Sequence, residues 1–100
     1  MRRLLSVAQA APATAFAPEQ AWRLSPQVAL RDEDFGALAY HYGNRRLVFL
    51  KSRLLVAVIT ALETYATASA ALDALVPSGQ RARYERALER LADSGVIDVR

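Results

Sequence analysis

The chain has 100 residues, no cysteine and a single histidine. Without cysteine it has no disulfide, thiolate metal site or cysteine nucleophile, and one histidine does not make a catalytic or metal-binding cluster. Hydrophobic residues make up 53% and charged residues 23% of the sequence, which is typical of a single globular domain. The net charge of +3 is compatible with an anionic partner but too small to indicate nucleic acid. We therefore expect a protein without enzymatic activity, metal ion or cofactor.

Residues 1–20 are rich in alanine and contain Pro12 and Pro18, so we expect a flexible N-terminal tail followed by a domain over residues 21–100. Two arginines precede a mildly apolar stretch near the start, but polar residues and Pro12 interrupt it, which disfavours a signal peptide. No stretch approaches the roughly 18 apolar residues of a membrane span. These features predict a cytoplasmic protein that has no membrane partner.

The first two predicted strands follow from alternating apolar and polar residues. WRLSPQVALR alternates on both sides of Pro26, which suits an edge strand or a broken strand. The charged stretch RDEDF that follows it is expected to be a turn. FGALAYHY then places leucine and tyrosine on one face and alanine and histidine on the other, which predicts a second strand.

The third predicted strand runs from Arg45 to Leu50 and joins the second through a corner at Gly43 and Asn44. In a sheet built in chain order, one side of this strand has no strand partner. Its charges lie at its ends, so the stretch LVF between them is a good template for a guest strand. We expect Val48→Pro to weaken guest binding by removing an N–H group from this edge while the fold survives.

From Ser52 onward the apolar residues recur at helical spacing, so three helices are expected after the strands. A serine or threonine at a predicted start can cap its helix, because the hydroxyl accepts a hydrogen bond from a free N–H group of the first turn. Gly95 suits the left-handed residue that often follows a helix. The predicted helices run from Ser52 to Leu62, from Thr67 to Val76 and from Ser78 to Ser94. The fold class is therefore α+β, with a three-stranded antiparallel sheet followed by three helices.

Two polar features give no catalytic or metal site. His41 lies on the alanine face of the second strand without an acidic neighbour to orient it, so it has a packing or solvent-facing role and not a catalytic one. Asp32, Glu33 and Asp34 lack the spaced oxygens and the glycine of a calcium loop. We expect this acidic triplet to be a solvated turn.

The third predicted helix carries charges of both signs. Glu85 and Glu89 lie four residues apart, as do Arg86 and Arg90, so like charges form an acidic and a basic stripe. A small winged-helix DNA-binding protein is the alternative to a peptide-binding protein, because it also combines three helices with a small sheet. The acidic residues of this helix would repel phosphate, so we favour peptide binding and expect no nucleic-acid partner.

Three stretches together carry a resemblance to a known family: LSPQVALR, FGALAYHYGNRRLVFLKS and the final LADSGV. Through them the chain, over about residues 20–100, resembles the MftB family of mycofactocin peptide chaperones, part of the PqqD-like group of RiPP precursor peptide recognition elements. The resemblance implies a winged helix-turn-helix-like domain that binds no DNA. It also implies a non-catalytic role, in which the protein captures the leader of a ribosomally made precursor as an added strand and presents it to a modifying enzyme.

For a member of that family the implied partners are the precursor peptide MftA and the radical SAM maturase MftC, which acts on the C-terminal valine and tyrosine of the peptide. The iron–sulfur chemistry would belong to the enzyme, since this chain has no cysteine. The implied leader site lies between the third strand and the third helix, with Leu47 and Phe49 as its main side-chain contacts. Carried over residue by residue, the site comprises Arg45, Arg46, Leu47, Val48, Phe49, Leu50, Arg83, Tyr84, Ala87, Leu88, Arg90 and Leu91.

Overall fold

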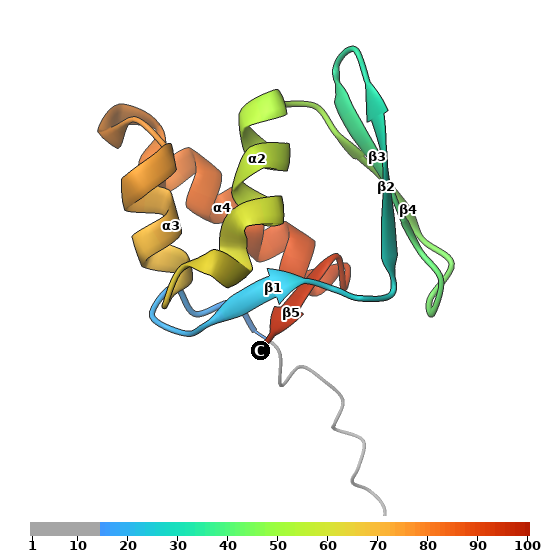
Figure 1. Cartoon of the computed structure of the whole chain (residues 1–100), viewed down its shortest axis with the longest axis horizontal. Helices are drawn as coiled ribbons and strands as arrows, with labels where there is room; N and C mark the ends of the chain where they lie inside the picture. Colours follow the sequence, from blue (N-terminus) through green and yellow to red (C-terminus); the bar gives the residue numbers. More distant parts are fainter. Residues whose placement is uncertain (1–14) are drawn as a thin grey trace, which may run out of the picture.

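The computed structural model describes residues 15–100 of the chain, and every structural statement below concerns this part. Strands come first, helices follow, and a short strand ends the chain (Figure 1). The prediction of an α+β protein with a three-stranded antiparallel sheet and three helices is confirmed. The elements are β1 (Trp22–Leu24), β2 (Val28–Glu33), β3 (Gly36–His41), β4 (Leu47–Leu50), α2 (Arg53–Ala61), α3 (Ala68–Leu75), α4 (Arg81–Asp93) and β5 (Ile97–Val99), with 3₁₀ turns at Leu62–Thr64 and Ser78–Gln80.

The predicted first strand is in fact two strands that belong to different sheets. β1 pairs antiparallel with β5, whereas β2 pairs with β3. The chain turns between β1 and β2 at Ser25 and Pro26, where the N–H of Ser25 donates to the carbonyl of Val96 at 2.9 Å and the Ser25 hydroxyl accepts from the N–H of Gln27 at 3.1 Å. Because proline has no N–H group to donate to a ladder, the break falls there.

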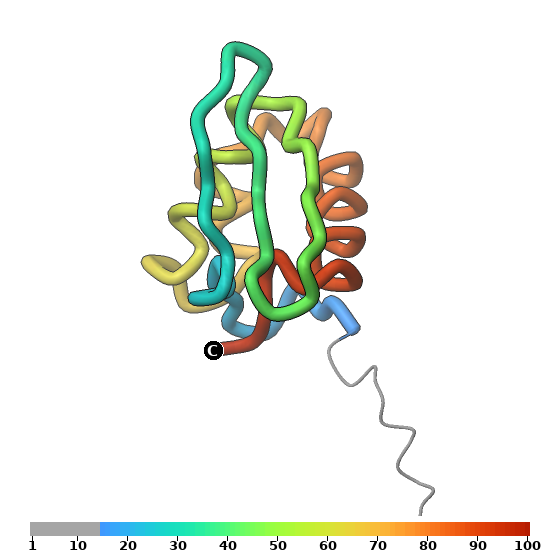
Figure 2. Tube along the Cα trace, turned by 90° about the vertical axis from the view of Figure 1, so that its right-hand side faces the viewer, coloured from blue at the N-terminus to red at the C-terminus, as the bar shows by residue number. Residues whose placement is uncertain are grey.

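β2, β3 and β4 form an antiparallel sheet with β3 in the centre. Asp32 and Glu33 continue β2, so the turn expected over RDEDF is wrong in extent and comprises only Asp34 and Phe35. The alternation predicted in FGALAYHY is confirmed, since the alanines of β3 are buried and Tyr40 is exposed. The sheet therefore has an inner face toward the helices and an outer face toward solvent, which Figure 2 views directly.

The helices cover the inner face of the sheet and share one core with it. α2 lies between the sheet and α3, and α4 packs against α3 (Figure 1). Burial of each large apolar side chain in such a core stabilises the fold by about 1.5 to 3 kcal/mol. The largest fully buried side chains are those of Trp22, Leu50, Val58, Ile59, Leu62, Leu72, Leu88, Val96 and Ile97.

The predicted caps of α2 and α3 and the predicted end of α4 are confirmed, whereas α4 begins at Arg81, later than the predicted start at Ser78, because Ser78–Gln80 form a 3₁₀ turn. The hydroxyls of Ser52 and Thr67 each accept a hydrogen bond from the N–H group three residues later, at 3.1 and 3.0 Å, and so cap α2 and α3. Gly95 follows α4 with a left-handed φ of 84°. The N–H of Val96 then donates to the carbonyl of Leu91 at 2.9 Å, which satisfies a carbonyl of the last turn and leads the chain into β5.

Part of the segment expected to be a tail packs against the domain. The ring of Phe16 lies 5.1 Å from that of Trp22, measured between centroids, and the carbonyl of Pro18 accepts a hydrogen bond from the N–H of Ser69 at 2.8 Å. These contacts attach the segment before β1 to the core and to the start of α3. Residues 1–14 of the expected tail lie outside the described residues.

Candidate functional site

The outer edge of β4 carries backbone groups that no other strand of the described residues pairs with. The N–H of His41 donates to the carbonyl of Arg46 at 2.9 Å, one position beyond the β3–β4 ladder and in the same register, so this bond shows which pairs of the ladder are hydrogen-bonded. Hydrogen-bonded and non-hydrogen-bonded pairs alternate in an antiparallel ladder, so Val48 also bonds to β3. The N–H and C=O groups of Leu47 and Phe49 therefore point away from β3, toward the free edge.

This register shows that the prediction for Val48→Pro was wrong. The N–H of Val48 faces Ala39 in β3, so proline at this position would break the ladder and leave the free edge unchanged. The edge donors belong to Leu47 and Phe49. Their side chains are 53% and 55% exposed and are available for contact with a guest.

A groove runs between β4 and α4, which Figure 2 shows next to each other along one side of the sheet. We call it the β4–α4 groove. Its volume is about 270 Å³, and apolar side chains from the strand and from two helices form much of its surface. Its lining comprises Phe49, Lys51, Ser52, Leu55, Arg83, Tyr84, Ala87 and Arg90.

Hydrogen bonds fix the distance between strand and helix at both ends of the groove. At one end, the side-chain amide of Asn44 donates to the carbonyl of Ser94 at 3.0 Å, and its oxygen accepts from the N–H of Arg46 at 2.9 Å. At the other end, the hydroxyls of Ser52 and Tyr84 are hydrogen-bonded at 2.8 Å. These bonds link the two walls at both ends, so the separation of the walls is already defined in the free protein, and preorganisation of this kind lowers the cost of binding a ligand.

His41 shapes the turn that leads into β4. It is buried, and its Nδ1 accepts hydrogen bonds from the N–H groups of Gly43 and Asn44 at 3.0 and 3.1 Å. These bonds orient the Asn44 side chain toward the end of α4. Of the two roles predicted for His41, packing or facing solvent, the structure shows the packing role.

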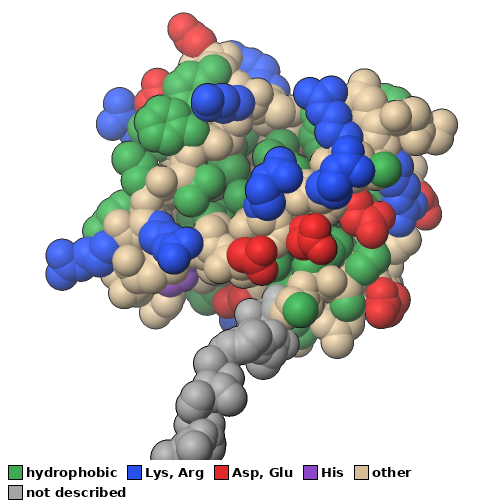
Figure 3. All heavy atoms as spheres, turned by 180° about the vertical axis from the view of Figure 1, so that it is seen from behind, with side chains coloured by type: hydrophobic (Ala, Val, Ile, Leu, Met, Phe, Trp, Pro, Cys, Tyr) green, Lys and Arg blue, Asp and Glu red, His purple; other side chains and the backbone are tan. Residues whose placement is uncertain are grey.

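Positive charge surrounds the groove. Lys51, Arg83 and Arg90 line it, and none of the three forms an ion pair with a carboxylate of residues 15–100. On the face shown in Figure 3, Lys and Arg side chains surround hydrophobic ones, and a row of Asp and Glu side chains lies to one side. The unpaired cations favour a guest that carries acidic residues.

The basic stripe predicted on the third helix differs from the observed one by one member. Arg86 lines a separate opening together with Glu85 and Glu89, on another side of α4. In the β4–α4 groove, Arg83 and not Arg86 lies beside Arg90. Residues seven apart lie two turns apart on nearly the same face of a helix, so this pair is as compatible with helical geometry as the predicted one.

The groove brings together part of the predicted site. Leu88 is fully buried and Leu91 nearly so, and both belong to the core behind the groove and do not line it. The predicted residues that do line it are Phe49, Arg83, Tyr84, Ala87 and Arg90.

The strand side of the predicted site is shorter than expected. β4 begins at Leu47, so Arg45 and Arg46 belong to the connection between the turn and the strand, although the carbonyl of Arg46 still accepts from the N–H of His41. Arg45 has a left-handed φ of 65°, and the turn therefore extends beyond the predicted corner at Gly43 and Asn44.

Three lining residues were missed: Lys51, Ser52 and Leu55. The sequence does indicate that Ser52 lies at the site, because a helix cap that directly follows an edge strand is located at the end of that strand. Leu55 is an apolar position of α2, and its contact with the groove depends on how α2 and α4 pack, which the sequence of either helix does not define.

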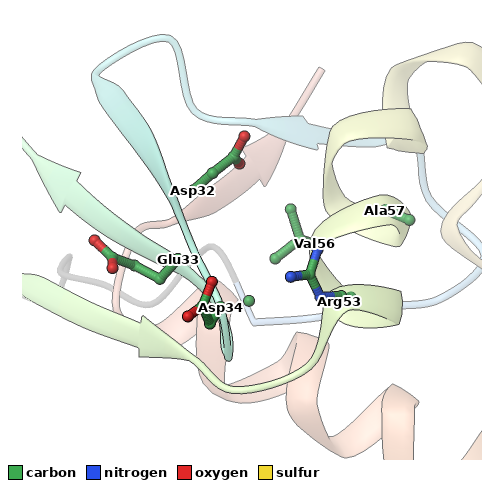
Figure 4. A pocket seen from close by; sticks show the side chains of 7 residues that line it. Asp32, Glu33, Asp34, Arg53, Val56 and Ala57 are labelled. Carbon is green, nitrogen blue, oxygen red and sulfur yellow. The ribbon is translucent and has the colours of Figure 1, made fainter.

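A second opening, at the other edge of the sheet, has the opposite charge. It lies between the end of β2 and the start of α2 and has a volume of about 470 Å³. Figure 4 shows Asp32 and Asp34 on its strand side and Arg53, Val56 and Ala57 on its helix side. Because carboxylates line it, an acidic guest would be repelled there and attracted to the β4–α4 groove.

Three kinds of group meet at the β4–α4 groove: edge backbone groups, apolar side chains and cations. Within residues 15–100, no group of three or more His, Cys, Asp and Glu side chains is placed to hold a metal ion. No helix in the described part of the chain is long and apolar enough to cross a membrane. Edge backbone groups, apolar side chains and cations together suit an extended peptide that has both apolar and acidic residues.

Comparisons with known proteins agree on one family. The sequence model of the Peptide chaperone MftB family matches residues 21–98. Proteins named Peptide chaperone MftB from three organisms are similar to the chain. The protein of Mycobacterium ulcerans is 46% identical, and the match covers 97% of this chain and 94% of the relative. The proteins of Mycobacterium tuberculosis and Mycolicibacterium smegmatis are each 44% identical, with matches that cover 90% and 89% of this chain and 84% and 88% of the respective relative. No solved structure matches with significance. A peptide chaperone is a non-catalytic protein, so the expectation of no enzymatic activity agrees with these relatives, and the chain belongs to the Peptide chaperone MftB family.

Proposed function

We propose that the chain binds the leader of a ribosomally made precursor peptide as an added strand along β4 and presents it to a radical SAM maturase in mycofactocin biosynthesis. One observation carries this proposal: the free N–H and C=O groups of Leu47 and Phe49 lie along a groove whose other wall is α4. An extended peptide completes such an edge and places alternate side chains in the groove. The family of the chain is named for a peptide chaperone, which supports a peptide as the guest.

Backbone pairing and apolar burial supply most of the binding free energy. The two edge residues offer roughly four backbone hydrogen bonds, each with a net value of about 0.5 to 1.5 kcal/mol. Alternate guest side chains face Leu55 and Ala87 in the groove, and burying one large apolar side chain there contributes about 1.5 to 3 kcal/mol. Lys51, Arg83 and Arg90 act mainly on the association rate and on the preference for an acidic leader.

The guest is a precursor of the MftA type, and the enzyme is a maturase of the MftC type. The chain has no cysteine, so the iron–sulfur chemistry of a radical SAM enzyme takes place in the partner. The contribution of this chain is positional. By holding the leader, it keeps the rest of the precursor at a high effective concentration beside the enzyme.

DNA binding in the manner of a winged helix is the less favoured function. In a winged helix the last helix enters the major groove. Here that helix is α4, on which Glu89 and Asp93 are exposed and would repel phosphate. The inner side of α4 is occupied by the core through Leu88, and Ser94 at its end is bonded to the turn before β4.

A set of leader peptides, each with one N-methylated residue, tests strand addition. N-methylation removes a single N–H donor and keeps the side chain. In a strand paired with β4, alternate guest residues donate to the carbonyls of Leu47 and Phe49, so we expect about a tenfold loss of affinity at two positions that lie two residues apart. The residues between and beside them should tolerate the change. Calorimetry measures each affinity against the unmodified leader, and a loss without this alternation would contradict strand addition.

A further inference from the structure

The outer face of the sheet carries a group of exposed apolar side chains, of which only Leu47 and Phe49 also belong to the proposed leader site. Tyr42, Phe49, Leu47, Phe35 and Tyr40 are 61%, 55%, 53%, 41% and 36% exposed. We call these five residues the aromatic face. Full burial of one aromatic side chain removes about 150 to 250 Å² from solvent, so the group presents on the order of 400 Å² of accessible side-chain surface.

The side chains of the aromatic face are ordered against one another. The rings of Phe35 and Phe49 are stacked, with centroids 5.9 Å apart, and those of Tyr40 and Tyr42 meet edge to face at 5.3 Å. Tyr40 is also directly opposite Leu47 in the β3–β4 ladder. The helices lie behind the sheet in the view of Figure 2, so the outer face of the sheet is on the solvent side. A contiguous apolar patch of this size on a solvent-facing sheet is typical of a protein interaction surface.

The charges around the aromatic face select the kind of partner. Arg45 and Arg46 lie at the turn end of β4 and Lys51 at its other end, and none of them forms an ion pair within the described residues. Arg31 on the neighbouring β2 is 78% exposed and pairs with Glu33. A partner surface that is apolar in its centre and acidic at its rim complements this arrangement.

A second copy of this chain fits the face poorly. Two copies joined by a two-fold axis place the same patch against itself. Because cations lie at both ends of β4, either relative direction of the two strands brings arginine or lysine of one copy near arginine or lysine of the other. Such like-charge contacts oppose association.

The aromatic face is continuous with the leader site. Directly opposite residues of adjacent strands project to the same side of a sheet, so guest residues opposite Leu47 and Phe49 place their side chains beside the aromatic face. A bound leader therefore enlarges the face by one strand. A protein that docks there contacts the chain and the leader together.

We propose that the aromatic face is the docking surface for the enzyme that modifies the guest, and that the enzyme binds the leader-loaded chain more tightly than the free chain. This inference rests on the proposed function, since it requires a guest strand on β4. The coupling is reciprocal: the factor by which the leader tightens enzyme binding equals the factor by which the enzyme tightens leader binding.

The double variant Tyr40→Ser/Tyr42→Ser tests the docking surface. Both side chains lie outside the β4–α4 groove and are exposed. Thermal unfolding should therefore show an unchanged melting temperature, and calorimetry should show an unchanged affinity for the leader peptide. Affinity for the purified mycofactocin radical SAM maturase, measured by surface-immobilised binding with and without leader, should fall at least tenfold. Val99→Ser removes an exposed apolar side chain from β5, outside the aromatic face, and serves as the control, which should bind both partners like the wild type.

The outcomes separate this inference from the proposed function. Unchanged maturase binding by the double variant, or a maturase affinity that leader does not alter, would overturn the inference while leader binding stands. A wild-type chain that binds no leader would overturn the proposed function and, with it, the coupling. If sedimentation shows a dimer that the double variant abolishes, self-association is the correct reading of the face. The single variant Tyr42→Ser, at the more exposed of the two positions, repeats the test with the smaller structural change.

Discussion

Replacing Phe49 by proline is expected to weaken leader binding by about 10- to 100-fold, because a guest carbonyl that loses its donor stays unpaired at a cost of about 1 to 3 kcal/mol. The N–H of Phe49 points away from β3, so the fold does not depend on it. Proline is tolerated on an edge strand when its nitrogen faces outward. Calorimetry with the leader peptide measures the loss, and thermal unfolding confirms that the domain is intact.

Two matched variants identify the cause of this loss. Phe49→Ala removes the ring and keeps the N–H group, so the difference between Phe49→Pro and Phe49→Ala isolates the backbone donor. Val48→Pro places proline one residue earlier, where the N–H group bonds to β3. This variant is expected to destabilise the fold instead. Leader affinity of Phe49→Pro equal to that of Phe49→Ala would show that the edge donor is not used.

Gly36→Ala is expected to destabilise the protein by more than about 2 kcal/mol, since strained backbone alone costs roughly 1 to 3 kcal/mol. Gly36 has a φ of 149°, and a Cβ atom on it would lie 2.1 Å from the carbonyl oxygen of Leu50 and 3.0 Å from the nitrogen of Ser52. Both contacts are with backbone, so no side chain can rotate away. The clash would push β3 away from the chain that leads from β4 into α2, at one end of the groove.

Urea denaturation measures this effect, with Gly79→Ala as the control. A Cβ atom on Gly79 meets nothing within 4 Å, so that variant should change the free energy of unfolding little, by less than about 1 kcal/mol. Equal stability of the two variants would mean that the backbone at Leu50 and Ser52 does not approach Gly36 closely enough to exclude a Cβ atom.

Side-chain periodicity predicts which face of a strand is buried, but not where its backbone groups point. The alternation in LVFL correctly separates exposed Leu47 and Phe49 from buried Leu50. The direction of the Val48 N–H depends on which cross-strand pairs are hydrogen-bonded, and this depends on the turn. The turn extends to Arg45, which has a left-handed φ of 65°. Arginine is not a residue type that predicts a left-handed backbone, so the sequence does not indicate where this turn ends.

Contacts between distant segments account for most of the other differences. β1 pairs with β5, so Trp22 lies opposite Val99, and nothing in the local pattern of WRLSPQVALR identifies a partner at the other end of the chain. The helices were predicted well because their caps and apolar positions are local features. The groove was predicted only in part, since its lining depends on how separate elements pack.

Hydrogen exchange of the β4 amides tests most directly whether the free edge receives the leader. Without leader, the amides of Leu47 and Phe49 have no partner strand and are expected to exchange quickly, whereas the amide of Val48 is bonded to β3. At saturating leader, exchange at Leu47 and Phe49 should slow at least tenfold, because paired edge amides exchange only when the added strand opens, and Val48 should change much less. Fast exchange at Leu47 and Phe49 in the fully loaded protein would contradict strand addition at β4.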